Sequence, residues 1–197
     1  MPTTNLKQTF CSFRERCIWL QTCVNTFEAL YSSSHCVEKL LRETAPAFFG
    51  DLNTILQEYI LLQICNLTDP ADSYDATLRR KVPNLTVAHL NELLKAEGLL
   101  TVQIEAAANN LAHYRNLVER SRNKLISHLD KTTVLAGTVL GEHARSDIDA
   151  FFENLYQYCD GVGNSVLEGP LDFRVTSGPG DVMDVLKYLN GGVYPRD

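Results

Sequence analysis

The chain lacks an apolar run long enough to cross a lipid bilayer. Of its 197 residues 45% are hydrophobic, but the most apolar stretch, around residues 59–67, is short and interrupted by polar side chains. A transmembrane helix needs about 20 largely apolar residues. The first ten residues, MPTTNLKQTF, are polar, and no short apolar segment with a small-residue cleavage site follows them. We therefore expect a cytoplasmic protein that makes no contact with a membrane.

The six cysteines lack the spacing of a metal site. They occupy positions 11, 17, 23, 36, 65 and 159, form no C-x-x-C pair, and have no histidine at zinc-ligand spacing. The first three recur every six residues, which distributes them around a helix. We interpret the cysteines as reduced, mostly buried apolar side chains in a reducing compartment. The sequence predicts neither a metal ion nor another cofactor.

Several other signatures are missing. Gly161-Val162-Gly163 is not followed by the Gly-Lys-Ser/Thr of a phosphate-binding loop, and no serine lies in a nucleophile-elbow pattern. Sustained alternation of apolar and polar residues, which indicates β-strands, is also absent. The one candidate strand, residues 171–176 (LDFRVT), would be isolated. We therefore expect no sheet.

Positive charge is in the minority but is unevenly distributed. The formal net charge is −6, which argues against indiscriminate binding of nucleic acid. Between residues 111 and 131, however, five Lys or Arg and two acidic residues give a local balance of +3. A second basic cluster, Arg79-Arg80-Lys81, lies in an expected loop. These groups are either ordinary solvated side chains or local surfaces for an anionic ligand on an acidic protein.

Apolar residues spaced three and four apart predict helices through most of the chain. Helices are expected over residues 6–30, 35–44, 47–67, 85–96, 99–129, 147–167 and 181–189. A loop of about fourteen residues, 69–82, is long for a connection within a bundle and is therefore either mobile or functional. The expected fold is all-α, an antiparallel up-and-down bundle with short accessory helices. Residues 1–167 would form the domain, and residues 168–197 a tail with a short helix.

The segment RNKLISHLDK, residues 122–131, concentrates the chemistry of the chain. Arg122 stays charged, and its planar guanidinium can contact two phosphate oxygens at once. His128 has a reference pKa near ~6.5 and can both take and give a proton at neutral pH. These two groups together are the minimum equipment for metal-free cleavage of RNA. Since basic residues are common in the last turn of a helix, the alternative is that both are ordinary helix-end residues.

Helix geometry limits how Arg122 and His128 can cooperate. Six residues advance about 600° along an α-helix, so the two side chains diverge by about 120° and are separated by a rise of about 9 Å. They do not converge on one phosphate within one ideal helix. Either the helix bends at its end, or a symmetric second copy supplies the missing groups across a two-fold interface.

Arg122, Asn123 and His128 match the arginine, polar residue and spaced histidine of the HEPN superfamily (higher eukaryote and prokaryote nucleotide-binding). The stretch LLQICNLTDP, followed after a loop by PNLTVAHL, resembles the abortive-infection subfamily of these proteins. The resemblance covers roughly residues 5–165. It implies a helical bundle that forms a two-fold homodimer, with the motif helices facing each other, and RNA cleavage in a toxin or antiphage-defence role. A partner antitoxin protein is a further possible consequence.

Carried over residue by residue, the resemblance assigns catalytic roles to three positions. Arg122 would stabilise charge on the scissile phosphate, and His128 would act as general base or acid. Asn123 would orient the phosphate or the histidine. Lys124 and Arg120 are the expected substrate-binding residues. The alternative for Lys124 is that its positive charge only lowers the pKa of His128 by like-charge repulsion. The alternative function is a non-catalytic HEPN dimer that binds a nucleotide or a protein partner.

Overall fold

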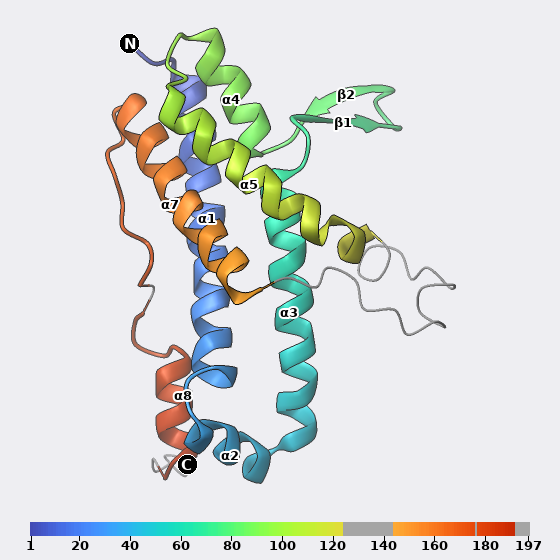
Figure 1. Ribbon diagram of the computed structural model, residues 1–197, viewed down its shortest axis with the longest axis vertical. Coiled ribbons are helices and arrows are strands. Elements are labelled where there is room, and N and C mark those ends of the chain that lie inside the picture. Colours follow the sequence, from blue (N-terminus) through green and yellow to red (C-terminus); the bar gives the residue numbers. More distant parts are fainter. Residues whose placement is uncertain (124–143, 176, 192–197) are drawn as a thin grey trace. The chain divides into compact units, whose positions relative to one another are not determined.

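The computed structural model describes residues 1–123, 144–175 and 177–191 (Figure 1). The helices in these ranges are α1 (Thr4–Tyr31), α2 (His35–Thr44), α3 (Pro46–Thr68), α4 (Val87–Ala96), α5 (Val102–Ser121), α7 (Arg145–Ser165) and α8 (Val182–Leu189). Two short strands, β1 (Asp72–Asp75) and β2 (Arg80–Pro83), complete the described elements. The predicted all-α fold class is confirmed.

The chain divides into two compact units. The first contains residues 1–17 and 61–172, and the second contains residues 18–60 and 173–197. Each of the helices α1 and α3 therefore has one part in the first unit and the other part in the second unit. The predicted boundary at residue 167 is a different division of the chain and stays a prediction.

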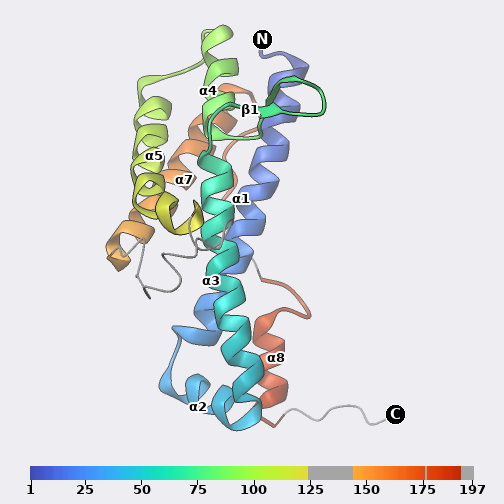
Figure 2. The same cartoon turned by 90° about the vertical axis from the view of Figure 1, so that its right-hand side faces the viewer.

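The first unit is built around the antiparallel pair α5 and α7, which lie side by side in both views (Figures 1 and 2). Tyr158 of α7 is completely buried, and its ring meets the edge of Phe13 of α1, with 6.0 Å between the ring centroids. The Tyr158 hydroxyl donates to Asn91 Oδ1 of α4 at 2.9 Å and lies 3.2 Å from the carbonyl oxygen of Val87. One buried tyrosine thus joins α1, α4 and α7.

Close backbone contact explains the glycine near the end of α7. The helix continues through Gly163 to Ser165. A Cβ atom added at Gly163 would lie 2.3 Å from the carbonyl oxygen of Gly169, a distance that atoms in contact do not reach. Gly163 therefore allows the chain that follows α7 to fold back against the helix.

The expected loop of residues 69–82 contains a β-hairpin, so the prediction of a chain without any sheet was wrong. The strands β1 and β2 pair antiparallel, with Tyr74 opposite Lys81 and Asp75 opposite Arg80. Each strand has only four residues, too few for the alternation of apolar and polar residues to become recognisable. The hairpin stands apart from the helices of its unit (Figure 1).

The start of α4 also differs from the expectation. The helix begins at Val87 and not at residue 85, because Thr86 is the N-cap and its hydroxyl accepts a hydrogen bond from the backbone N–H of His89 at 3.2 Å. The Asn84 side chain donates to the carbonyl oxygen of Pro70 at 3.0 Å. Asn84 thereby closes the base of the hairpin.

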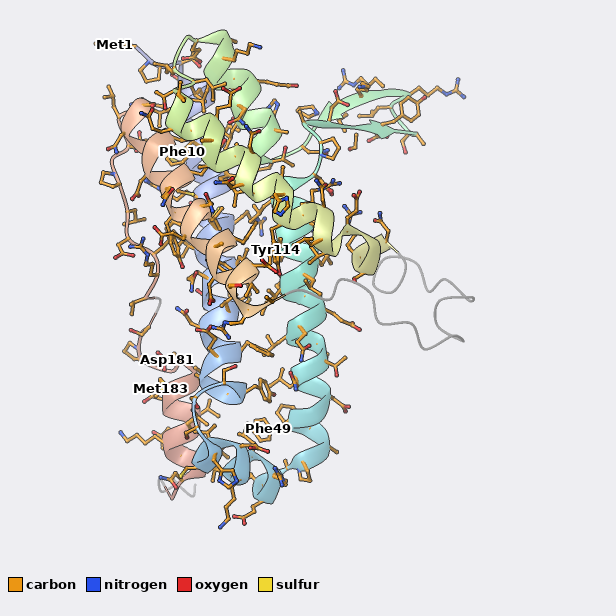
Figure 3. All side chains as sticks on the ribbon, viewed as in Figure 1. Met1, Phe10, Phe49, Tyr114, Asp181 and Met183 are labelled. Atoms are coloured by element: carbon orange, nitrogen blue, oxygen red, sulfur yellow. The ribbon has the colours of Figure 1, made fainter. Side chains whose placement is uncertain are left out.

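The second unit contains the later part of α1, the earlier part of α3, and α2 and α8. Its core consists of Leu30, Leu41, Phe49 and Leu186, and Figure 3 labels Phe49 within it. The Tyr31 hydroxyl donates to the carbonyl oxygen of Phe49 at 2.8 Å, which ties α1 to α3. The predicted short helix in the tail is confirmed as α8, capped by Asp181.

None of the helices in the described ranges combines the length and the apolar composition that crossing a bilayer requires. The cytoplasmic location stays a prediction.

Candidate functional site

Arg115 of α5 and Arg122, the residue directly after α5, lie on one face near the end of this helix. Arg115 and Arg122 are seven residues apart, which is about 20° short of two full helical turns, with a rise of about 10.5 Å. Between them, Val118 and Ser121 are buried, with exposed fractions of 0% and 5%. Because these buried residues fix the rotation of α5, both arginines are directed along the border of the core.

Asp69 joins the two arginines. Its Oδ1 atom accepts a hydrogen bond from Arg115 Nη2 at 3.0 Å and another from Arg122 Nη2 at 2.5 Å. A carboxylate between two guanidinium groups offsets the repulsion between two like charges. Because both arginines bind this one oxygen, their Nη2 atoms are separated by no more than the sum of the two hydrogen-bond lengths.

The position of Asp69 follows from the end of α3. The hydroxyl of Thr68 donates to the carbonyl oxygen of Ile64 at 2.7 Å, so Thr68 closes the last turn of the helix. Pro70 has no backbone N–H and cannot continue a helix, and it also disfavours helical geometry at Asp69. The Leu-Thr-Asp-Pro sequence thus places one carboxylate directly beyond the helix, where it meets α5.

This cluster is largely shielded from solvent. The exposed fractions of the side chains are 17% for Arg115, 19% for Arg122 and 23% for Asp69. Arg115 Nη2 also pairs with Glu119 Oε1 at 3.0 Å. The formal charges of these four residues cancel, as expected for charged groups that are removed from water.

Three polar atoms in this region are buried without a hydrogen-bond partner among the described residues. They are the Nε atoms of Arg115 and Arg122 and the hydroxyl oxygen of Ser121. Buried donors without partners are rare in folded proteins, because losing contact with water costs free energy that a new hydrogen bond must offset. Their concentration around one ion-pair cluster marks the end of α5 as a candidate functional site.

The thiol of Cys65 on α3 borders the same cluster. Burial raises the pKa of Cys65, whereas the hydrogen bond and positive charge of Arg122 act in the opposite direction. Arg122 therefore interacts with Cys65 of α3 and with Asp69, the residue directly after α3. Tyr114 of α5, which Figure 3 labels, packs against Phe151 of α7 with ring centroids 5.1 Å apart.

The predicted site residues are described only in part. Arg122 and Asn123 follow α5 in a π-helical turn, and Asn123 is half-buried. A π-turn is a departure from α-helical geometry that is often found at functional sites. His128, Lys124 and the side chain of Arg120 lie outside the described residues. The cooperation of Arg122 with His128 therefore stays a prediction.

Asp69 and Arg115 were not among the predicted site residues. The sequence did contain two signals for them. Leu-Thr-Asp-Pro is part of the family resemblance, although residue 69 is expected only as the start of the loop of residues 69–82. The seven-residue spacing of Arg115 and Arg122 places both side chains on one helix face.

Comparison with known proteins supports the resemblance drawn from these residues. The chain matches the family model HEPN_AbiU2, described as AbiU2, over residues 3–185. No curated protein and no solved structure matches the chain. The matched range includes Asp69, Arg115, Arg122 and His128. The chain therefore belongs to the HEPN_AbiU2 family, a HEPN-type abortive-infection family.

Proposed function

We propose that this protein is a metal-independent endoribonuclease that acts as a homodimer in an abortive-infection response. The observation that carries the proposal is the fixed position of Arg122, which Asp69 holds beside Arg115 at the start of the Arg-Asn…His motif. A guanidinium that is already oriented before substrate binds needs little reorganisation when negative charge develops on a phosphate. Family membership supports the same assignment.

The reaction uses the substrate's own 2′-hydroxyl as nucleophile. His128 takes the proton from this hydroxyl, a bond forms between O2′ and phosphorus, and the bond from phosphorus to O5′ breaks. The leaving O5′ receives a proton from a second acid. The products are a 2′,3′-cyclic phosphate and a 5′-hydroxyl end. Arg122 stabilises the charge on the non-bridging phosphate oxygens, and Asn123 orients the phosphate or the imidazole.

A second copy of the chain supplies the second acid. Arg122 and His128 would diverge by about 120° on one ideal helix, so two motifs facing each other across a two-fold axis give one histidine for the base and another for the acid. Lys124 and Arg120 add positive charge for contact with the substrate. Two copies of this region also double its local positive charge, which helps an acidic protein to bind RNA.

One observation favours a second candidate, a HEPN dimer that binds a nucleotide or a protein partner without cleaving RNA. The formal charges of Arg115, Arg122, Asp69 and Glu119 cancel, so the described part of the site offers no net positive charge to a phosphate. In this alternative the ion-pair cluster stabilises the fold, and the motif binds without turnover.

Cleavage of purified RNA in the presence of EDTA separates the two candidates. Wild-type protein should cleave RNA and leave 2′,3′-cyclic phosphate ends, whereas His128→Ala and Arg122→Ala should not. His113→Ala is a matched control, because His113 is an exposed histidine on α5 and lies outside the motif. Ribonucleotide binding without cleavage by the wild type would favour the second candidate. Sedimentation of the same proteins measures whether they are dimers.

The biological role is tested by expression in growing cells. Wild-type protein should stop growth, and His128→Ala should not. If a partner antitoxin protein exists, its co-expression should restore growth. Equal growth inhibition by wild type and His128→Ala would exclude catalysis as its cause.

A further inference from the structure

The hairpin of β1 and β2 exposes an unusual set of side chains for a connection between helices. Tyr74 is 68% exposed and Leu78 54% exposed. Arg79, Arg80 and Lys81 are also exposed. Lys81 pairs with Asp72 at 2.8 Å, but no ion pair of Arg79 or Arg80 is found within the described part of the chain. The hairpin therefore presents two exposed arginines for which the described residues show no ion pair, and one exposed aromatic ring, with a net charge of +1 over residues 72–83.

Hydrogen bonds fix the hairpin at both ends. At its base, the backbone N–H of Asn84 donates to the carbonyl oxygen of Ala71 at 2.8 Å, and Ser73 Oγ donates to Asn84 Oδ1 at 3.0 Å. At its tip, Asp75 Oδ1 accepts from the backbone N–H groups of Thr77 and Leu78 at 2.8 and 2.9 Å. An isolated two-stranded hairpin is only marginally stable, so these bonds help to hold the backbone of the hairpin in its conformation.

The backbone at Arg79 adds a second, independent indication. Its φ angle is +50°, in the left-handed region where turns usually have glycine or asparagine. An arginine at such a position carries strain, and strain of this kind tends to persist at functional sites. An arginine in place of glycine is explained if its side chain binds a ligand.

We infer that this hairpin is an arm that binds single-stranded RNA beside the cleavage site. Exposed tyrosine rings stack on bases of any sequence, and arginines contact the phosphates between them. The inference rests on the proposed ribonuclease function and adds a substrate-binding surface to it. Addition of a strand from a protein partner is disfavoured, because both strands are short and β2 contains Arg80, Lys81 and Pro83.

The arm is within reach of an RNA strand bound at Arg122. Asp69, which holds Arg122, precedes the first residue of β1 by three positions, a span of at most about 11 Å. The four residues of a strand extend the arm by a further ~13 Å. Together these lengths put the tip at most ~24 Å from Asp69 along the chain. A strand whose stacked bases repeat every ~3.4 Å covers all of this span with about seven nucleotides, whereas a dinucleotide covers only a small part of it.

Binding of a fluorescein-labelled single-stranded RNA of about 20 nucleotides tests the inference. Measured by anisotropy in the His128→Ala background, the double variant Arg79→Ala/Arg80→Ala should raise Kd by about 10-fold or more and reduce the salt slope by about 1.4. Tyr74→Ala should raise Kd by about 5-fold or more, whereas Tyr74→Phe, which keeps the ring, should not. The control is Lys39→Ala/Arg42→Ala on α2, which removes the same charge from side chains that are 64% and 67% exposed.

Kinetics with His128 intact provide the second measurement. For the long RNA, the arm variants should raise KM, and for a dinucleotide they should leave kcat and KM unchanged. Equal Kd and equal salt slope in wild type and arm variants would refute RNA binding by the hairpin and point to a protein partner for it. This result would leave the endoribonuclease proposal standing. If the unaltered protein neither binds nor cleaves RNA, the proposed function fails and the arm fails with it.

Discussion

Replacement of Asp69 by alanine is the most informative perturbation of the ion-pair cluster. The substitution removes the carboxylate that accepts hydrogen bonds from both Arg115 and Arg122. Two guanidinium groups then remain close together, with side chains only 17% and 19% exposed. Asp69→Ala should therefore lower the free energy of unfolding and release Arg122 from its orientation.

The expected magnitude follows from electrostatics. Two unit charges ~5 Å apart in an effective dielectric of ~20 repel by about 3 kcal/mol, and removing one partner of a buried ion pair costs about 3–5 kcal/mol. Partial exposure and the remaining partner of Arg115, Glu119, reduce this cost. We expect a loss of about 2–3 kcal/mol, and hence a fall in Tm of roughly 5–10 °C for a chain of this size. Displacement of Arg122 by about 1 Å should also lower kcat by about 100-fold.

A double-mutant cycle shows whether the arginines cause this loss. Adding Arg122→Ala to Asp69→Ala removes one of the two repelling charges. The double variant should therefore lose about 1–2 kcal/mol less stability than the two single variants lose in sum. Asp72→Ala is the matched control, because it removes a carboxylate from an exposed ion pair on the hairpin and should leave Tm unchanged. Wild-type stability of Asp69→Ala, or additive effects in the cycle, would refute the account of the cluster.

Three further predictions concern the core and the thiols. Burial raises the pKa of Cys17, so its thiolate is scarce near pH 8 and its reaction with a thiol reagent should require unfolding. The exposed Cys36 should react at once. Mass spectrometry of the labelled chain identifies which cysteine has reacted. Gly163→Ala places a Cβ atom against the Gly169 carbonyl and should destabilise the protein by about 1–3 kcal/mol. Gly50→Ala in α3 has open space around the new Cβ atom and should stabilise the protein by about 0.5–1 kcal/mol. Thermal unfolding measures both effects. Tyr158→Phe should cost about 1–2 kcal/mol in chemical denaturation, because the Asn91 side chain loses its buried partner.

The helices could be predicted from sequence because their signals are local. Phe10, Phe13 and Cys17 repeat at helical spacing, and all three are completely buried in α1. Ser34 directly precedes the expected helix of residues 35–44 and is its N-cap, since its hydroxyl accepts a hydrogen bond from the backbone N–H of Val37 at 3.3 Å. Each of these features depends on residues only a few positions apart, so spacing and residue type were sufficient.

The hairpin and the ion-pair cluster depend on contacts that local patterns do not contain. The strands form because Asn84 binds the backbone around Pro70, fourteen positions earlier, and not because their residues alternate. Asp69 meets Arg122 across 53 positions of sequence. The family resemblance involves the Leu-Thr-Asp-Pro segment and the motif that begins at Arg122, but only the structure shows that Asp69 and Arg122 are in contact. The pairing of Arg122 with His128 stays a prediction.

The most direct test of the central claim is the chemistry of the RNA ends after incubation with the protein in EDTA. We predict that wild-type protein leaves 2′,3′-cyclic phosphates opposite 5′-hydroxyls and that His113→Ala retains both ends. Both ends should disappear in Arg122→Ala and His128→Ala, and in Asp69→Ala they should form about 100-fold more slowly. Cleavage that stops on addition of EDTA, or that yields 5′-phosphates, would contradict a mechanism built on Arg122 and His128.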